Sequence, residues 1–219
     1  LLFSLHNQVE NGAFLRGDDL IFRLDGSEMV LCSRKDIRLR GEHNIENVLA
    51  ASCCAVAFGA RPESIREALK DFTGVEHRLE SVAVVDGVEY INNSMCTNVE
   101  AAVRSVEAID EPQIVIAGGK DKGSDFTLFG EALAKKAKQV ILIGEDAYLI
   151  ENAARDAGFD RISRAESMDS AVKAAKALAE PGDVVVLTPG CASFDMFSSF
   201  EERGKVFKDA VRSLSGFSD

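Results

Sequence analysis

Apolar residues in the second half of the chain follow two alternating patterns. Short uninterrupted apolar runs predict buried strands, and apolar residues that recur every three to four positions between them predict helices. The predicted strands are residues 113–117, 139–143, 161–163 and 183–188, and the predicted helices are residues 103–109, 126–136, 147–157, 167–179 and, mainly, 194–214. Strands that are apolar on both sides and alternate with helices are typical of a parallel sheet covered on both faces. We therefore predict an α/β fold with a doubly wound, mainly parallel sheet.

The first forty residues have a different pattern. Short strand-like segments at residues 3–5, 13–16, 20–24 and 29–32 are separated by glycine-containing turn signals. A β-rich segment of this size is too small to enclose a core alone. We interpret residues 1–42 as the C-terminal remnant of another domain.

Residues 43–219 are assigned to a second domain, which begins with a helical junction at residues 43–76. The elements predicted at its start are helices 43–58 and 62–72 and strands 79–85 and 88–91. Gly59 is a typical residue after a helix, and Asp86-Gly87 is a strong hairpin signal between the two strands.

Charge and composition exclude several classes of protein. The chain has 219 residues and a formal net charge of −11, which argues against a general nucleic-acid or membrane-surface binder. It has no apolar run near the ~20 residues of a membrane span and no recognisable signal peptide. Five cysteines without a CxxC pair fit a reducing cytoplasm better than disulfides or zinc, and we expect no metal site.

Polar chemistry gathers in the loops that follow the predicted strands, where ligands of such folds bind. Residues 92–98 contain five amide or hydroxyl side chains within seven positions, more than one helix cap requires. Residues 118–125 begin with two glycines directly after a strand, which permit the backbone to lie close to a ligand, and they contain two lysines. Alone they could form a solvated turn, and they lack the P-loop pattern GxxxxGK[ST]. Cys96 is a poor candidate for a nucleophile, because no activating base is evident.

A third loop, residues 189–193, leads into a segment with three phenylalanines at helical spacing, which are more often core than binding surface. Ser193 could cap a helix there and also bind a ligand. No serine–histidine pairing is evident around this motif, since no histidine lies near it in the sequence.

Five motifs in order along the chain resemble the Mur ligase superfamily. They are HNxxN at residues 43–47, HRxE at 77–80, NSxxTN at 93–98, GGxxKxxDF at 118–126 and PxxxSxDxFxxFExRG at 189–204. The last two are similar to those of the members that add D-glutamate to UDP-N-acetylmuramoyl-L-alanine. The resemblance spans roughly residues 3–213, and it implies that the chain is the end of a central ATPase domain followed by a Rossmann-like C-terminal domain.

The resemblance also implies an activity. It indicates a bacterial, cytoplasmic, ATP-dependent ligase of peptidoglycan precursor synthesis that is monomeric at full length, with D-glutamate, ATP and UDP-N-acetylmuramoyl-L-alanine as ligands. The reaction passes through an acyl phosphate with Mg²⁺ present. The P-loop and the magnesium ligands of the family have no counterpart here, so we expect no catalytic residue in these 219 residues and no activity from them alone.

Individual site residues follow from the same resemblance. Asn44, Asn47, Arg78 and Asn93 match positions that contact ATP in the family, and Thr97, Lys122, Ser193 and Phe200 match positions that hold D-glutamate. In two places the chain departs from many relatives: Asn93 replaces an aspartate and Met95 replaces a lysine. The loss of that lysine implies greater reliance on Lys122, with Lys120 as a second candidate.

Two alternatives remain at this stage. One is a ligase of the same superfamily that uses a different amino acid or a different acyl acceptor. The other is a non-catalytic Rossmann-like binding module, which predicts that the loops carrying Thr97, Lys122 and Ser193 do not converge.

Overall fold

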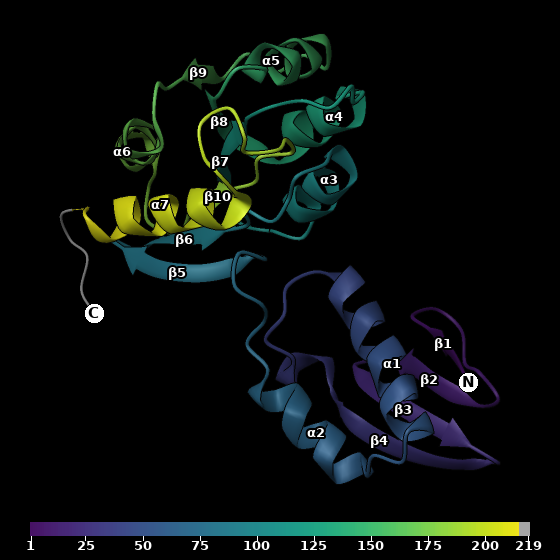
Figure 1. The fold of residues 1–219 in the computed structure, drawn as a ribbon. Coiled ribbons are helices and arrows are strands. Elements are labelled where there is room, and N and C mark those ends of the chain that lie inside the picture. The colour runs from purple at the N-terminus through teal and green to yellow at the C-terminus, as the bar shows by residue number, and fades with distance from the viewer. Residues whose placement is uncertain (215–219) are drawn as a thin grey trace. The chain divides into compact units, whose positions relative to one another are not determined.

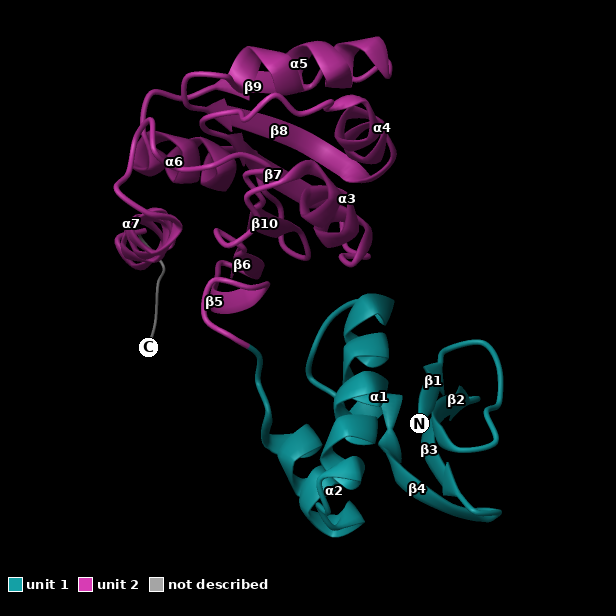
Figure 2. Cartoon of the chain, turned by 45° about the vertical axis from the view of Figure 1, so that its right-hand side comes forward, with its two compact units in different colours: residues 1–74 teal, residues 75–219 magenta. Residues whose placement is uncertain are grey.

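The computed structural model describes residues 1–214, which form two compact units with a boundary between Gly74 and Val75. Figure 2 colours the two units separately. The predicted domain assignment, with residues 1–42 as a remnant of another domain, stays a prediction. The structural boundary falls two residues before the end of the predicted helical junction, because both junction helices pack on the first unit's sheet.

The first unit is a four-stranded sheet covered by two helices (Figure 1). Its elements are β1 (Leu2–Ser4), β2 (Gly12–Arg16), β3 (Asp19–Leu24), β4 (Ser27–Ser33), a short 3₁₀ helix (Arg34–Asp36), α1 (Glu42–Ala57) and α2 (Pro62–Asp71). Strand β1 is parallel to β2, and the other neighbours are antiparallel. Phe22 and Leu31 of the sheet pack in one core with Leu49 of α1 and Ile65 of α2. The helices therefore supply the apolar cover that the strands need to enclose a core.

The second unit is the predicted doubly wound sheet, with strand order β5-β6-β10-β7-β8-β9. Its strands are β5 (Glu80–Val85), β6 (Val88–Asn92), β7 (Gln113–Gly118), β8 (Ala137–Ile143), β9 (Ile162–Arg164) and β10 (Val184–Leu187). Its helices are α3 (Val99–Glu107), α4 (Thr127–Lys136), α5 (Ala147–Asp156), α6 (Met168–Leu178) and α7 (Phe200–Arg212). Only the β5–β6 hairpin is antiparallel within the described sheet. No helix of the described residues is long and apolar enough to span a bilayer.

Each central strand is buried on both faces, as its apolar sequence predicts. In β7, Val115 and Ala117 pack in the core beneath α3, α4 and α5, whereas Ile114 and Ile116 pack beneath α6 and α7. Figure 1 shows these helices on opposite sides of the sheet. The alternation of side chains along a strand therefore fills two separate cores.

One predicted element is partly wrong: the segment expected to be mainly helical from residue 194 becomes helix only at Phe200. Ser199, and not Ser193, is the cap, and its side chain accepts a hydrogen bond from Glu202 N at 3.2 Å. The Glu202 carboxylate in turn accepts one from Ser198 N at 2.6 Å. This reciprocal pattern resembles a capping box, and it fixes where the helix begins.

Gly130 of α4 packs directly against the backbone of α5, and its replacement by alanine tests that contact. A Cβ at this position would lie 2.3 Å from Ala153 O. Alanine normally stabilises a helix interior by about 1 kcal/mol relative to glycine. Here we expect Gly130→Ala to lower the free energy of unfolding by about 1–3 kcal/mol through overpacking. Chemical denaturation measures this, with Glu131→Ala on the exposed face as the control; a stabilised Gly130→Ala variant would contradict the close packing.

Candidate functional site

The loops that follow β6, β7, β8 and β10 lie along the carboxyl edge of the sheet and are bonded to one another. Gly190 N donates to Cys96 O at 3.1 Å, which joins the loop after β10 to the loop after β6. Lys120 and Ala192 exchange two backbone hydrogen bonds of 2.9 and 3.0 Å, which join the loop after β7 to the loop after β10. The loops that carry Thr97, Lys122 and Ser193 therefore converge, and the expectation of unrelated surface loops is not met.

The paired glycines after β7 allow this close approach. Gly118 and Gly119 have φ values of 117° and 136°, in a region that favours glycine. A Cβ on Gly118 would lie 2.0 Å from Ile143 O, and one on Gly119 would lie 2.2 Å from Ala192 O. The glycines thus bring the backbones of three loops together, whereas the sequence suggested an approach to a ligand.

A buried arginine that the sequence analysis did not select as a site residue holds the same edge. Arg203 of α7 is 1% exposed, and its guanidinium donates to Ser94 Oγ at 2.9 Å, Ser94 O at 2.8 Å and Cys191 O at 3.0 Å. Burial lowers the pKa of Arg203 to about 10, so the group remains protonated at neutral pH. The only sequence signal was its place in the ExRG end of the last motif, since its partners lie far away in the chain.

The residues matched to D-glutamate binding lie on these joined loops. Ser193 is buried, and its hydroxyl forms no hydrogen bond with any residue from 1 to 214. Thr97 is half-buried. It directly precedes Asn98, whose Oδ1 caps α3 by accepting a hydrogen bond from Ala101 N at 2.9 Å. Phe200 is the half-buried first residue of α7, and its carbonyl accepts a bond from Ser94 Oγ at 2.7 Å.

The two lysines of the glycine loop differ in what they contact. Lys120 Nζ lies 2.7 Å from Glu145 Oε2, and that hydrogen bond raises the pKa of Lys120. Lys122 is exposed and forms no ion pair in the part of the chain that the structure describes. Lys122 is thus the cation of this loop that is available to an anionic ligand.

The residues matched to ATP binding are divided between the two units. In the first unit, Asn47 Nδ2 donates to Asn44 Oδ1 at 3.2 Å, and Asn44 Nδ2 donates to Arg40 O at 2.7 Å. Asn44 is thereby fixed, while Asn47 is exposed at the start of α1.

In the second unit, Arg78 and Asn93 have opposite environments. Arg78 is exposed, and its guanidinium has no partner among the described residues. Asn93 is buried; its Oδ1 accepts a bond from Leu79 N at 3.2 Å and its Nδ2 donates to Ser105 Oγ at 2.8 Å. Arg78 is therefore accessible from solvent, whereas Asn93 is engaged inside the protein.

The cysteines of this edge are not activated. Burial raises the pKa of the Cys96 thiol to about 11 and that of the Cys191 thiol to about 12. Both thiols are therefore protonated at neutral pH, whereas only the deprotonated thiolate is a good nucleophile. This agrees with the prediction from the sequence that Cys96 is a poor candidate for a nucleophile.

One trio of described residues has the spacing of a metal site, but another cation occupies it. Ligand atoms of Glu76, His77 and Glu80 lie within 4.8 Å of one another. The ammonium of Lys208 lies 2.5 Å from Glu76 Oε1 and 3.1 Å from Glu80 Oε1. His77 Nδ1 is taken by Asn92 Nδ2 at 2.9 Å. This trio does not fit Mg²⁺, because a lysine already supplies the positive charge.

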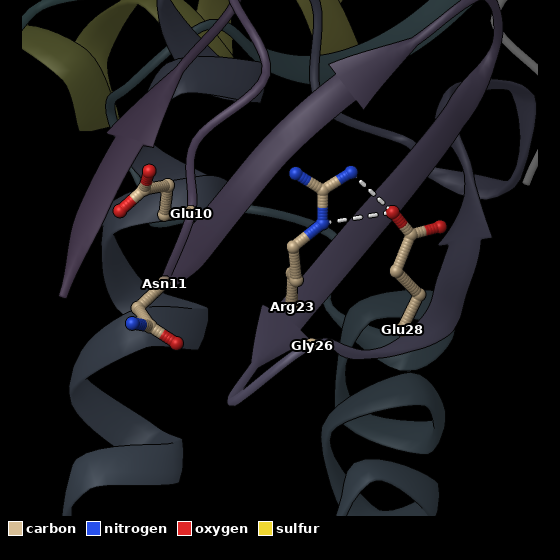
Figure 3. A pocket seen from close by; sticks show the side chains of 5 residues that line it. All are labelled: Glu10, Asn11, Arg23, Gly26 and Glu28. Atoms are coloured by element: carbon tan, nitrogen blue, oxygen red, sulfur yellow. Dashed lines mark hydrogen bonds and ion pairs between the residues drawn. The ribbon is translucent and has the colours of Figure 1, made fainter.

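A pocket of about 530 Å³ in the first unit is a separate feature (Figure 3). It is lined by Glu10, Asn11, Arg23, Gly26 and Glu28. The Arg23 guanidinium is already occupied, because Nε donates to Glu28 at 2.8 Å, Nη1 donates to Val9 O at 3.0 Å, and the group lies over the Phe14 ring. The pocket therefore offers no free cation to a ligand.

The fold is an α/β domain whose carboxyl edge holds a lysine and a hydroxyl that are unpaired within residues 1–214, together with an exposed arginine. Residues 77–191, more than half of the chain, match the family model described as Mur ligase, glutamate ligase domain. The chain belongs to the Mur ligase family.

Similar proteins cover nearly the whole chain. It is 46% identical over 214 residues to a UDP-N-acetylmuramoylalanine--D-glutamate ligase of Pelotomaculum thermopropionicum and 44% identical over 215 residues to one of Koribacter versatilis. Each alignment covers 98% of this chain and 47% of the relative, so the chain spans about half the length of these relatives.

Solved structures agree on the fold. A UDP-N-acetylmuramate-alanine ligase of Thermotoga maritima has a TM-score of 0.67 at 15% identity, with 96% of this chain and 47% of that chain covered. A folylpolyglutamate synthase of Mycobacterium tuberculosis has a TM-score of 0.63 at 17% identity, with 94% and 47% covered.

Replacement of Arg203 by lysine tests its role at the carboxyl edge. A lysine ammonium is a point charge and cannot reach both loops in the fork geometry of a guanidinium. We expect Arg203→Lys to lower the free energy of unfolding by about 2–4 kcal/mol, since at least one buried acceptor loses its charged donor. Urea denaturation measures the loss, and Arg212→Lys, at the exposed end of the same helix, is the control. Equal stabilities of the two variants would argue against this role.

Proposed function

We propose that the chain is the C-terminal half of an ATP-dependent ligase that adds D-glutamate to UDP-N-acetylmuramoyl-L-alanine, a step of peptidoglycan precursor synthesis in the bacterial cytoplasm. The observation that carries the proposal is the convergence of the loops of Thr97, Lys122 and Ser193, with Lys122 and the Ser193 hydroxyl unpaired within residues 1–214. The identity of 44–46% to ligases of that name supports this choice of amino acid.

The amino acid suits these groups chemically. D-Glutamate carries two carboxylates, and we assign one to the Lys122 ammonium in a charge-assisted hydrogen bond. The other is assigned to the Ser193 hydroxyl and nearby backbone N–H groups, with Thr97 as a further donor. Phe200 provides an apolar wall for the methylene groups. Lys120 is a weaker candidate than Lys122, because Glu145 already pairs with it.

The nucleotide contacts are assigned residue by residue. The free guanidinium of Arg78 fits a phosphate, for which arginine is well suited. Asn47 is assigned to the adenine base, with Asn44 holding its side chain in place. We assign Asn93 to the backbone of Leu79 beneath Arg78, since both ends of its amide are engaged there.

The part of the reaction that this chain performs is positioning. ATP supplies the phosphate that converts the carboxylate of the UDP-linked substrate to an acyl phosphate. The loops at the carboxyl edge hold D-glutamate so that its amine can attack the acyl carbon. The C–N bond forms, the C–O bond to phosphate breaks, phosphate leaves and the amine loses a proton. Holding the amine in place gives it a high effective concentration. We assign the Mg²⁺ to the part of the longer protein outside this chain, since the Lys208 ammonium already occupies the acidic trio of Glu76, His77 and Glu80.

An assay of the longer protein tests the proposal. Phosphate release should require ATP, UDP-N-acetylmuramoyl-L-alanine and D-glutamate together, and the product should contain a new amide bond. L-Glutamate and other amino acids should give less than a tenth of the rate. A preference for another amino acid would identify a different ligase of the family, and no amide formation with any amino acid would favour a binding module.

Lys122 gives a sharper test in the same assay. We expect Lys122→Ala to raise KM for D-glutamate roughly ten- to hundred-fold, the equivalent of one charge-assisted contact of about 1.5–3 kcal/mol. The KM for ATP should change much less. Lys120→Ala is the matched control from the same loop and should raise KM for D-glutamate less than Lys122→Ala does. Equal effects of Lys122→Ala on both substrates would exclude it as an amino-acid ligand.

A further inference from the structure

Arg78 lies in a backbone turn that is sterically unfavourable. Its neighbours His77 and Leu79 have φ values of 65° and 45°, in the left-handed region that side chains rarely adopt. The other non-glycine residues with positive φ in the described chain, Asp25 and Asp86, each precede a glycine in a hairpin turn. The turn at residues 77–79 has no glycine, so other contacts must hold it.

Side chains from the sheet hold the turn at several points. His77 N donates to Glu80 Oε2 at 2.9 Å, and Leu79 N donates to Asn93 Oδ1 at 3.2 Å. The His77 ring accepts a hydrogen bond from Asn92 Nδ2 at 2.9 Å, and the same amide group donates to Glu80 Oε2 at 2.9 Å. Glu80 is thus the acceptor that joins the turn to β6.

The carboxylate of Glu80 is itself fixed by Lys208 from α7. Lys208 Nζ lies 3.1 Å from Glu80 Oε1, the oxygen that the turn does not use, and 2.5 Å from Glu76 Oε1. The Lys208 side chain is only 11% exposed, whereas that of Glu76 is 63% exposed. A buried lysine therefore bridges the two acidic residues on either side of the turn.

The turn also rests directly on α7. The His77 ring meets the Phe200 ring edge to face, with centroids 6.1 Å apart. A Cβ on Gly204 would lie 2.2 Å from His77 Nδ1, so this position of α7 accepts no side chain. The helix that begins at Phe200 is thus the base on which residues 77–79 are built.

We propose that Lys208 is a positioning residue, which locks the strained turn at residues 77–79 onto α7 and thereby presents Arg78 to the phosphates of a nucleotide. The nature of that ligand rests on the proposed function; the locking of the turn rests on the contacts above. Without the ammonium, Glu76 and Glu80 would face each other as like charges with no lysine between them. Glu80 would then be held beneath His77 only by its hydrogen bonds from His77 N and Asn92 Nδ2.

Hydrogen exchange and steady-state kinetics on the longer protein test the two parts. Lys208→Met removes the charge and keeps much of the apolar stem, and Lys205→Met, at an exposed position of α7, is the control. We expect Lys208→Met to speed exchange in the peptide covering residues 75–80 at least tenfold, with peptides of β7 unchanged. It should raise KM for ATP about tenfold and leave KM for D-glutamate within about threefold. Glu76→Gln, an exposed change that does not endanger folding, should act in the same direction but more weakly.

A double-variant cycle separates positioning from general stability. In an Arg78→Ala background, Lys208→Met should raise KM for ATP by less than a further twofold, because its effect passes through Arg78. The proposal is overturned by unchanged exchange at residues 75–80, by faster exchange throughout the second unit, or by additive effects of the two changes on KM. If the unaltered protein lacks the ligase activity, the proposed function fails, and the exchange arm still decides whether Lys208 locks the turn.

Discussion

The arrangement of the candidate site depends on one buried guanidinium. Arg203 is removed from water, and no carboxylate of residues 1–214 forms an ion pair with it. Its three hydrogen bonds go to Ser94 and Cys191 on two different loops. Burial of a charge costs much free energy unless its hydrogen bonds are satisfied. The two loops are therefore restricted to conformations in which their oxygen atoms accept hydrogen bonds from Arg203. Ser94 Oγ in turn donates a hydrogen bond to Phe200 O, so the same arrangement also fixes the start of α7.

Around this fixed frame, the groups suited to ligands are those that the frame does not use. Lys122 and Arg78 are exposed and unpaired within residues 1–214, and the Ser193 hydroxyl is free. By contrast, Lys120, Asn93 and Lys208 are engaged in the protein. A rigid scaffold with a few free polar groups is suited to small charged ligands, because few side chains lose conformational entropy on binding.

The sequence predicts the sheet well, because the uninterrupted apolar run of strands such as β7 is a local signal that burial on both faces requires. It also predicts which loops converge, since parallel strands end at the same edge. It does not predict the roles of Arg203 and Lys208, whose partners lie far away in the chain. The late start of α7 could have been predicted, because Ser199 and Glu202 have the spacing of a capping box. The ligand roles of individual residues came from family resemblance and remain proposals.

The central claim is that the three loops form one pocket for an amino acid with two carboxylates. A crystal structure of the longer protein with D-glutamate and a non-hydrolysable ATP analogue tests this most directly. The account predicts one carboxylate within about 3 Å of Lys122 Nζ and the other within the same distance of Ser193 Oγ. D-Glutamate bound away from both loops, or paired with Lys120 while Lys122 stays in solvent, would contradict it.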